Sequence, residues 1–237
     1  MALENISDDG FIIEAKRNYA PEMVTAFIKL NGATVGAVAN RTKVYDDDMN
    51  VAAEFDAKLT AKGCNKAAEF VNFCDAFSIP VLTLTNVNGF AATMCQEKNG
   101  AKASSKLVYA FANATVPKVN LIIGDAIGSA YVTMNSKATG ADIVYAWPTA
   151  KVGMMEAKSA VEIMYADEIA NGDANQVINE KVAEYQNLQG SVMAAAARGY
   201  VDSIVEPVDT RKYLIGAFES YIQSLKKDLV KNTEQCK

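Results

Sequence analysis

The stretch Val119-Asn-Leu-Ile-Ile-Gly-Asp-Ala-Ile-Gly-Ser-Ala-Tyr131 decides the fold class. Its apolar start, Val119–Ile123, predicts a buried strand, the small residues that follow predict a turn, and a helix is expected from Tyr131. The same order occurs earlier, where the strand pattern of Val81–Val87 leads into the turn Asn88-Gly89-Phe90. A repeat of strand, glycine-containing turn and helix predicts an α/β domain with crossover connections.

The segments on either side fit this class. Asn31-Gly32 separates the strand patterns of 23–30 and 34–39, and this dipeptide is the strongest short hairpin signal because both turn residues accept positive φ. Helical spacing of apolar residues predicts helices over 62–77 and around 104–112. The other expectations are a loose N-terminus over 1–10, an exposed acidic loop over 40–49, a strand over 143–146, and helices over 174–198 and 210–227.

The chain shows no low-complexity linker, so residues 1–237 are expected to form a single domain. Residues 210–237 are expected to be a C-terminal helix and tail, which either mediates oligomerisation or covers the sheet.

Composition excludes several kinds of chemistry. The 237 residues contain no histidine, which removes Ser-His-Asp and Cys-His catalysis and histidine-ligated metals. The 28 acidic and 23 basic residues give a net charge of -5, which offers no basic footprint for nucleic acid. The four cysteines form no CxxC and predict free thiols. Without a signal peptide or a run of about twenty apolar residues, we expect a cytoplasmic protein that does not span a membrane.

The turn Gly128-Ser129-Ala130 is the first candidate for chemistry. A strand that enters a helix through small residues leaves backbone N–H groups free, and these stabilise an anion without any titratable side chain. The alternative is structural, because small residues also let a helix pack closely on a sheet. The turn at Gly89-Phe90 allows the same two interpretations. Nearby carboxylates and phenols are weaker candidates, because such residues are more often surface charges or packing residues: Glu97, Glu156, Glu162, Tyr131 and Tyr145.

Short blocks between about Gly10 and Arg211 follow one order along the chain. They include Thr34-Val-Gly-Ala-Val-Ala-Asn40, Lys66-Ala-Ala-Glu-Phe-Val-Asn-Phe-Cys-Asp-Ala-Phe77, Leu107-Val-Tyr-Ala-Phe-Ala112, Gly128-Ser-Ala-Tyr131, Tyr145-Ala-Trp-Pro-Thr-Ala150 and Ala196-Ala-Arg-Gly-Tyr-Val-Asp202. Together they resemble the C-type carboxyltransferase domain of biotin-dependent acyl-CoA carboxylases and decarboxylases. So many blocks in one order make the resemblance specific.

The resemblance implies a crotonase-type (ClpP-like) α/β fold of repeated ββα units with a helical C-terminal tail. It implies transfer of a carboxyl group between carboxybiotin and the α-carbon of an acyl-CoA. The turn begun by Gly128 would provide the amides of Ser129 and Ala130 as an oxyanion hole for the biotin ureido oxygen. By the same resemblance Gly89, Phe90 and Tyr131 would line the biotin side, and Val132 would influence acyl selectivity.

The resemblance also implies partners. An N-type carboxyltransferase subunit would hold most of the CoA, and a biotin carboxyl carrier protein would carry the biotin, within a homo- or hetero-oligomer. No metal is expected. The sequence departs from the family at Ser129, where a glycine is usual, at Glu156 and Ser159, again in place of glycines, and in a longer connection over 40–60.

Two other functions compete with this one. The first is a non-catalytic assembly subunit that kept the fold, which the departures at Ser129 and Glu156 favour and the preserved turn disfavours. The second is a stand-alone crotonase-type hydratase or isomerase, which would need two convergent carboxylates and a complete CoA site.

Overall fold

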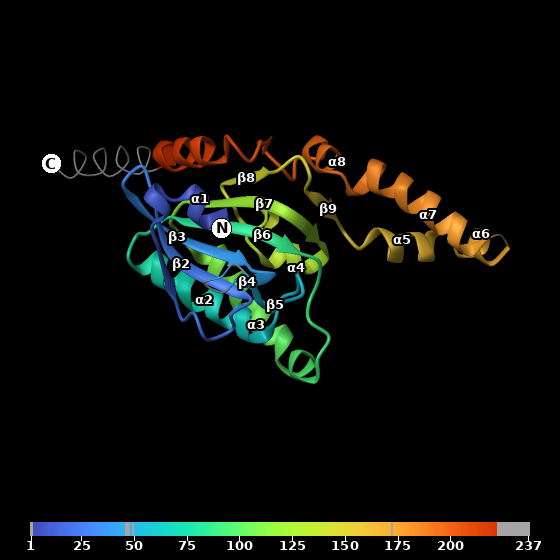
Figure 1. Cartoon of the computed structure of the whole chain (residues 1–237), viewed down its shortest axis with the longest axis horizontal. Helices are drawn as coiled ribbons and strands as arrows, with labels where there is room; N and C mark the ends of the chain where they lie inside the picture. Colours follow the sequence, from blue (N-terminus) through green and yellow to red (C-terminus); the bar gives the residue numbers. More distant parts are fainter. Residues whose placement is uncertain (1, 46–47, 49, 172, 222–237) are drawn as a thin grey trace.

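The computed structural model describes residues 2–45, 48, 50–171 and 173–221. Within these ranges an eight-stranded sheet organises the chain (Figure 1). Seven strands follow the order β1 (Ile12–Ala15), β2 (Met23–Leu30), β3 (Ala33–Asn40), β6 (Val81–Val87), β7 (Lys118–Ile127), β8 (Ile143–Ala146) and β10 (Ser203–Ile204), and β9 (Lys151–Gly153) also pairs with β7.

The sheet is mixed. Strand β2 pairs antiparallel with both β1 and β3, whereas β3, β6, β7, β8 and β10 run parallel to one another. The predicted hairpin is confirmed, because Asn31 and Gly32 join β2 to β3 with φ values of 50° and 77°. Since the central strands are parallel, their carboxyl ends lie along one edge of the sheet, where ligands bind most often in α/β folds.

Strand β7 is longer than expected and divides its pairing between two partners. Its first half pairs with β8 from Val119 to Ile122, and its second half pairs with β9 from Asp125 to Ile127. The sequence predicted a strand only over 119–123 and a helix from Tyr131. The prediction was short because β9 supplies backbone partners for residues 125–127, and helix α4 (Gly128–Thr133) begins at once.

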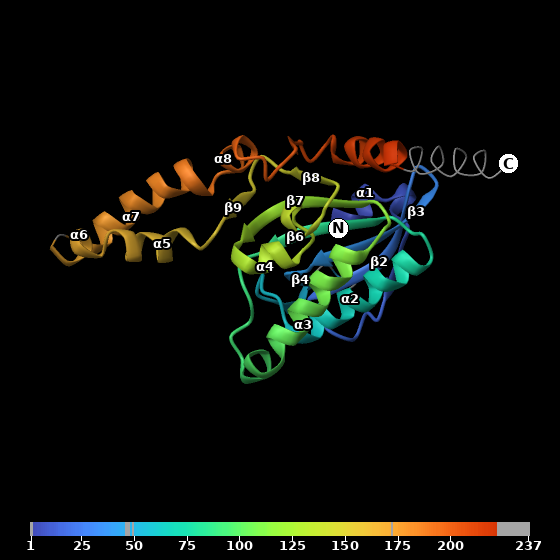
Figure 2. The same ribbon diagram turned by 180° about the vertical axis from the view of Figure 1, so that it is seen from behind.

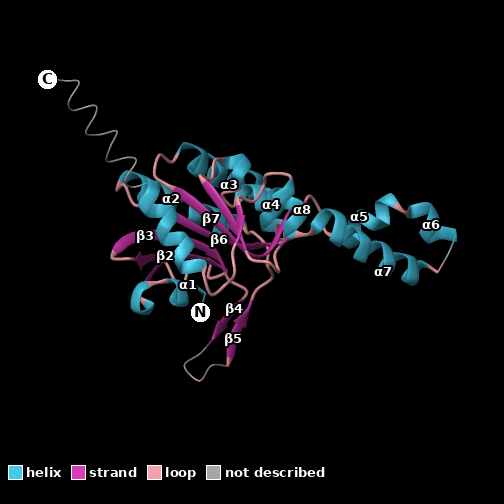
Figure 3. Ribbon diagram, turned by 90° about the horizontal axis from the view of Figure 1, so that it is seen from above, coloured by secondary structure: helices cyan, strands magenta, loops and turns pink. Residues whose placement is uncertain are grey.

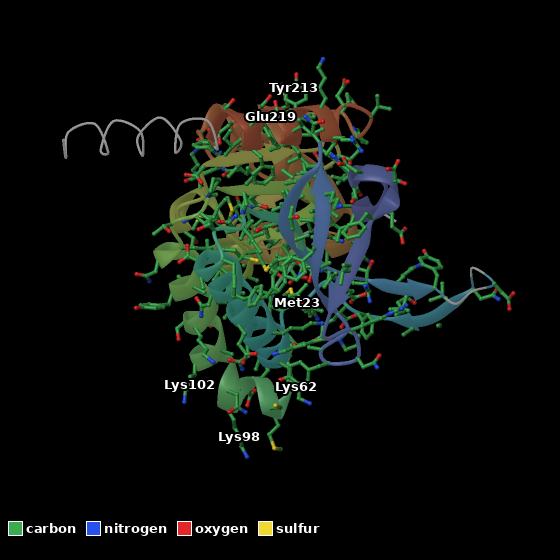
Figure 4. The ribbon with its side chains drawn as sticks, turned by 90° about the vertical axis from the view of Figure 1, so that its left-hand side faces the viewer. Met23, Lys62, Lys98, Lys102, Tyr213 and Glu219 are labelled. Carbon is green, nitrogen blue, oxygen red and sulfur yellow. The ribbon has the colours of Figure 1, made fainter. Side chains whose placement is uncertain are left out.

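Helices α2 (Ala61–Ala76) and α3 (Met94–Asn113) lie side by side on one face of the sheet (Figure 2). The predicted helix over 62–77 is confirmed as α2. Helix α3 begins ten residues before the predicted pattern, because the hydroxyl of Thr93 accepts a hydrogen bond from the Gln96 amide at 3.2 Å and caps a polar first half. Lys98 and Lys102 of that half point away from the protein in Figure 4.

The sheet separates two apolar cores. The core under α2, α3 and α4 includes Cys64, Cys74, Phe111 and Met134. Burial raises the pKa of the Cys64 and Cys74 thiols to about 12, so both stay protonated at neutral pH. These two and the exposed Cys95 are free thiols, as predicted, and Cys236 lies outside the described residues.

The other face is covered by α1 (Ala2–Ile6) and by a helix over 210–221, whose Leu214, Ala217 and Phe218 are buried against it. The described part of the C-terminal helix therefore covers the sheet, whereas the rest of the predicted tail, 222–237, lies outside the described residues. The expectation of a loose N-terminus is wrong, because Leu3 and Ile6 of α1 are buried in this second core.

Asp8, just after α1, fastens this face to the β2–β3 turn. Its carboxylate accepts hydrogen bonds from the amides of Gly32 at 2.7 Å and Asn31 at 3.1 Å, and Arg211 donates to it at 2.7 Å. These groups lower the pKa of Asp8 from its ordinary value of 3.8, and the hydrogen bond from the Gly32 amide contributes most.

We expect Asp8→Asn to lower the free energy of unfolding by about 1–2 kcal/mol at pH 7, because a charged acceptor of backbone N–H groups is lost. A carboxyl group whose pKa is lower in the folded state stabilises the fold above its unfolded pKa and loses that effect as pH falls through the folded pKa. The difference between the two proteins should therefore shrink below about pH 3.8. Urea unfolding of both proteins at pH 7 and pH 3 measures this difference in the free energy of unfolding. A difference that does not change with pH would contradict the stabilising role of the Asp8 carboxylate.

The stretch over 40–49, expected to be an exposed loop, is in part a second small sheet. Strands β4 (Lys43–Tyr45) and β5 (Val51–Glu54) pair antiparallel and project away from the main sheet (Figure 3). Residues 43–45 and 51–54 pair through their backbones, and the aspartate run between them concealed the two strands. Asp46, Asp47 and Met49 lie outside the described residues.

After β9 the chain leaves the sheet as a helical arm (Figure 1). It comprises α5 (Ala157–Met164), α6 (Ala166–Asn171), α7 (Ala174–Tyr185) and a π-helical turn (Gln186–Gly190), and α8 (Val192–Ala197) returns to the sheet. The single helix predicted over 174–198 is thus three segments, and α5 and α6 were not predicted. In the part of the chain that the structure describes, no helix is both long and apolar enough to cross a membrane.

Candidate functional site

The two predicted turns meet the same edge of the sheet. Strands β6 and β7 are parallel neighbours, and the turns at Gly89 and Gly128 follow their carboxyl ends. The structure therefore brings together the two backbone turns that the sequence singled out.

The backbone conformation at position 128 requires a glycine. Its φ is 65°, in the left-handed region, and a Cβ at this position would lie 3.2 Å from the carbonyl oxygen of Met154. This glycine lets β7 enter α4 without an intervening loop. The next amides, of Ser129 and Ala130, belong to the first turn of the helix and so have no carbonyl partner within it. The side chain of Ser129 is exposed and that of Ala130 is buried.

The Gly89 turn is held by the segment before α2. The carbonyl oxygen of Gly89 accepts a hydrogen bond from the Leu59 amide at 2.9 Å, and the Ala91 amide donates to the Leu59 carbonyl at 2.9 Å. Phe90 packs against the first core and remains partly exposed. Gly89 has a φ of 149° and open space where a Cβ would lie, so its backbone stays accessible at this edge.

Asn86 positions the ends of β6 and β7 and was missed from the sequence. Its side-chain oxygen accepts a hydrogen bond from the Asp125 amide at 3.0 Å, across a register shift between the two strands. A Cβ on Gly124 would lie 2.5 Å from the same oxygen, so Gly124 makes room for it. The signal available in the sequence was a glycine inside an otherwise apolar strand, which marks a bulge or a close approach.

The tyrosines do not provide side chains to this edge. Tyr131 is buried in the first core, its hydroxyl has no hydrogen-bond partner among the described residues, and burial, aided by the charge of Asp202, raises its pKa to about 12. This placement argues against a ligand contact by the Tyr131 side chain. Tyr145 is buried in the second core, where its ring packs edge-on against Tyr213, and burial raises its pKa. Val132, by contrast, is 41% exposed one turn beyond Gly128.

The three candidate carboxylates do not converge. Glu97 lies in the first turn of α3, and Glu162 forms an exposed ion pair with Lys158 at 3.9 Å. Glu156 directly precedes α5, makes no side-chain capping hydrogen bond to it, and lines a cavity of about 190 Å³ with Asp125 and Lys151. Among the residues that the structure describes, no three carboxylates or thiols are grouped closely enough to hold a metal ion. The site at this edge therefore consists of backbone donors beside apolar groups.

Parallel strands that end in helix-turn amides, with helices on both faces of the sheet, define an α/β protein. Residues 2–235 match the family described as "Carboxyl transferase domain", and the chain belongs to that family. The expected crotonase-type fold is confirmed by a transcarboxylase 12S structure, which superposes with a TM-score of 0.85 at 38% identity over 94% of this chain and 41% of that one.

Curated relatives agree with this assignment. The methylmalonyl-CoA carboxyltransferase 12S subunit of Propionibacterium freudenreichii is 40% identical over 221 residues, which are 92% of this chain and 40% of that protein. The mitochondrial propionyl-CoA carboxylase beta chain of Homo sapiens is 40% identical over 210 residues, or 88% of this chain and 36% of that protein. The chain thus spans about two fifths of the curated relatives that it matches.

Proposed function

We propose that this chain is the biotin-side half of an acyl-CoA carboxyltransferase, which moves a carboxyl group between carboxybiotin and an acyl-CoA. The observation that carries the proposal is the turn at Gly128, whose φ of 65° presents the amides of Ser129 and Ala130 at the carboxyl edge of the sheet. Donors of this kind suit a chain without histidine, because they stabilise negative charge without titrating.

The residues at this edge fit a neutral, planar cofactor with a carbonyl oxygen. Two amides would donate to the ureido oxygen, the open space over Gly89 admits a ring close to the backbone, and Phe90 and Val132 add apolar surface. When bound, carboxybiotin supplies the carboxyl group and leaves negative charge on the ureido oxygen. The task of this chain is to stabilise that charge with fixed dipoles, which need no reorganisation during the reaction.

We assign the rest of the reaction to partner subunits. An N-type carboxyltransferase subunit would supply the CoA site and a carrier protein would bring biotin, which the relationship to a carboxyltransferase named as a 12S subunit supports. Ring assembly is supported by the related 12S structure, which is described as a hexamer. Val132, exposed beside the turn, would contact the acyl group and influence its selection. A cytoplasmic location suits these partners.

The test is purification of the chain from its native extract under mild conditions, followed by mass spectrometry, a biotin blot and a transfer assay with free biotin. Co-purification with an N-type chain and a biotinylated protein, together with transfer, is the expected result. A complex that assembles but does not transfer would favour the assembly-subunit alternative. A homo-oligomer that hydrates or isomerises an acyl-CoA would overturn the proposal.

A further inference from the structure

A bulge interrupts the pairing of β6 with β7 just before the candidate oxyanion turn, residues 128–130. Thr85 pairs with Ile122, and the next pair joins Val87 to Ala126. Over this interval β6 advances by two residues and β7 by four, so β7 holds two extra residues. Bulges are common beside active sites, where they redirect the backbone. This one lies where β7 exchanges its partner β8 for β9.

The bulge determines which parts of the two turns lie at the same level. Gly89 and Gly128 each follow the pair Val87–Ala126 by two residues, and β6 and β7 lie side by side (Figure 2). In a ladder without the bulge, Gly124 would pair with Val87, and Gly128 would lie two residues, or about 6.6 Å, farther along its strand. The extra residues therefore bring the candidate oxyanion turn level with the Gly89 turn.

The side chain of Asn86 supplies the backbone pairing that the bulge removes. Its Oδ1 accepts a hydrogen bond from the Asp125 amide at 3.0 Å, as a backbone carbonyl would in a regular ladder. On the other side, the Asn86 amide donates to Oδ1 of Asn40 in β3 at 3.5 Å. Gly124 leaves the space for Asn86, since a Cβ there would lie 2.5 Å from its Oδ1. The φ of Gly124 is not positive, so the missing side chain is what matters at this position.

The far end of α4 is fixed separately. Met134 directly follows this helix, and its carbonyl oxygen accepts a hydrogen bond from Nδ2 of Asn120 in β7 at 3.3 Å. The hydroxyl of Thr85 in β6 donates to Oδ1 of Asn120 at 2.8 Å. All three residues are fully buried. Because the end of α4 is tied to both strands, a change in the bulge is transmitted to the start of the helix, where the candidate donors lie.

We propose that Asn86 is a positioning residue for carboxyl transfer: its bond to the Asp125 amide holds the bulge that aligns the amides of Ser129 and Ala130 with the Gly89 turn. The inference rests on the proposed function, since it takes these amides as the donors to the ureido oxygen. Asn86 acts through the backbone of residues 125–128. Fixed dipoles are effective only where charge develops, and a displacement of about 1 Å lowers a rate by up to about 10²-fold.

The first test measures the backbone without any reaction. In two-dimensional NMR spectra of the full chain, Asn86→Ala should shift the amide cross-peaks of Ser129 and Ala130. Asn86→Asp keeps an acceptor oxygen on a side chain of the same length and should return both peaks close to their original positions. The control is Asn113→Ala, whose side chain donates to the Tyr109 carbonyl of its own helix at 2.8 Å, and it should leave both peaks in place. Unshifted peaks in a folded Asn86→Ala protein would overturn the proposal.

The second test measures transfer by the complex with its native partners. Asn86→Ala should lower kcat about 10–10²-fold and leave KM for the acyl-CoA within about twofold, because alignment in the transition state is lost and CoA contacts are not. Asn86→Asp should restore kcat to within about threefold. An unchanged kcat in Asn86→Ala, beside slow transfer in Ser129→Pro, would overturn the positioning role and leave the proposed function intact. An unmodified complex without transfer activity would refute both.

A double-mutant cycle with Gly124 identifies the contact responsible. Gly124→Ala should lower kcat about as much as Asn86→Ala, because the new Cβ displaces the Asn86 oxygen from the Asp125 amide. In the Asn86→Ala background, where that oxygen is absent, Gly124→Ala should change kcat by less than about twofold. Gly216→Ala, whose Cβ would meet open space, is the matched control and should have no effect in either background. Fully additive effects of the Asn86 and Gly124 substitutions would contradict the assignment.

Discussion

Under the proposed function, Ser129→Pro should slow carboxyl transfer about 10²–10³-fold while the protein stays folded, because it removes one fixed donor to the developing charge. Proline lacks the backbone N–H, and its φ near -65° suits the first helical turn, where that N–H has no helical partner. Ser129 is the second residue of α4, so the substitution deletes only the donor in question. The measurement is the transfer rate of the complex, with circular dichroism to confirm the fold.

The matched control is Ser129→Ala, which removes the hydroxyl and keeps the amide. Its transfer rate should stay within about twofold of the unmodified protein, because the side chain of Ser129 is exposed and the proposal assigns it no role. A Ser129→Pro complex with undiminished transfer would refute the amide as a donor. A loss in Ser129→Ala equal to that in Ser129→Pro would point to the hydroxyl instead.

Phe111→Ala should lower the free energy of unfolding by about 3–5 kcal/mol, the largest effect on stability that we expect from one side chain. Phe111 is fully buried in the first core, on the face of α3 that packs toward the sheet. Truncation leaves a cavity in a region where helix and sheet are both fixed by hydrogen bonds, so little of the space can collapse. Denaturant unfolding followed by circular dichroism gives the value.

Tyr109, two residues earlier on α3, provides the comparison. Its side chain is 69% exposed, so Tyr109→Ala removes an aromatic ring from the same helix without opening a cavity. We expect a change within about 0.5 kcal/mol, since surface substitutions away from special features have small effects. Similar losses in the two variants would mean that the ring size, and not burial, determines the result.

The central strands could be predicted because their pattern depends on local residues. Buried strands such as Val81–Val87 are rich in valine, leucine and threonine, which favour strands, and Asn31-Gly32 fixes the hairpin by its own conformational preference. The second half of β7 could not be predicted, because Asp125–Ile127 are strand residues only through pairing with β9. The β4–β5 hairpin and helices α5 and α6 were missed for a related reason. Strands β4 and β5 pair with each other, and α5 and α6 pack on α7, outside the main sheet.

The backbone turns of the candidate site could be predicted from the sequence. Gly128 and the small residues after it predict a strand that leads directly into a helix. The structure places that turn beside Gly89. Side-chain roles were less predictable, because orientation depends on tertiary packing. Tyr131 follows the turn in sequence yet is buried in the core, while Asn86 positions the two strands through a contact that no local pattern encodes.

The helical arm formed by α5, α6 and α7 has a consequence for how fast a charged molecule meets the protein. Residues 156–185 of this arm hold seven acidic and two basic side chains, a net charge of -5 that equals the net charge of the whole chain, and the arm projects from the sheet (Figure 1). An approaching cationic surface is therefore oriented before contact, which raises association rates by about 10–10³-fold at low salt. Added salt should slow assembly through the association rate and leave the lifetime of the complex nearly unchanged.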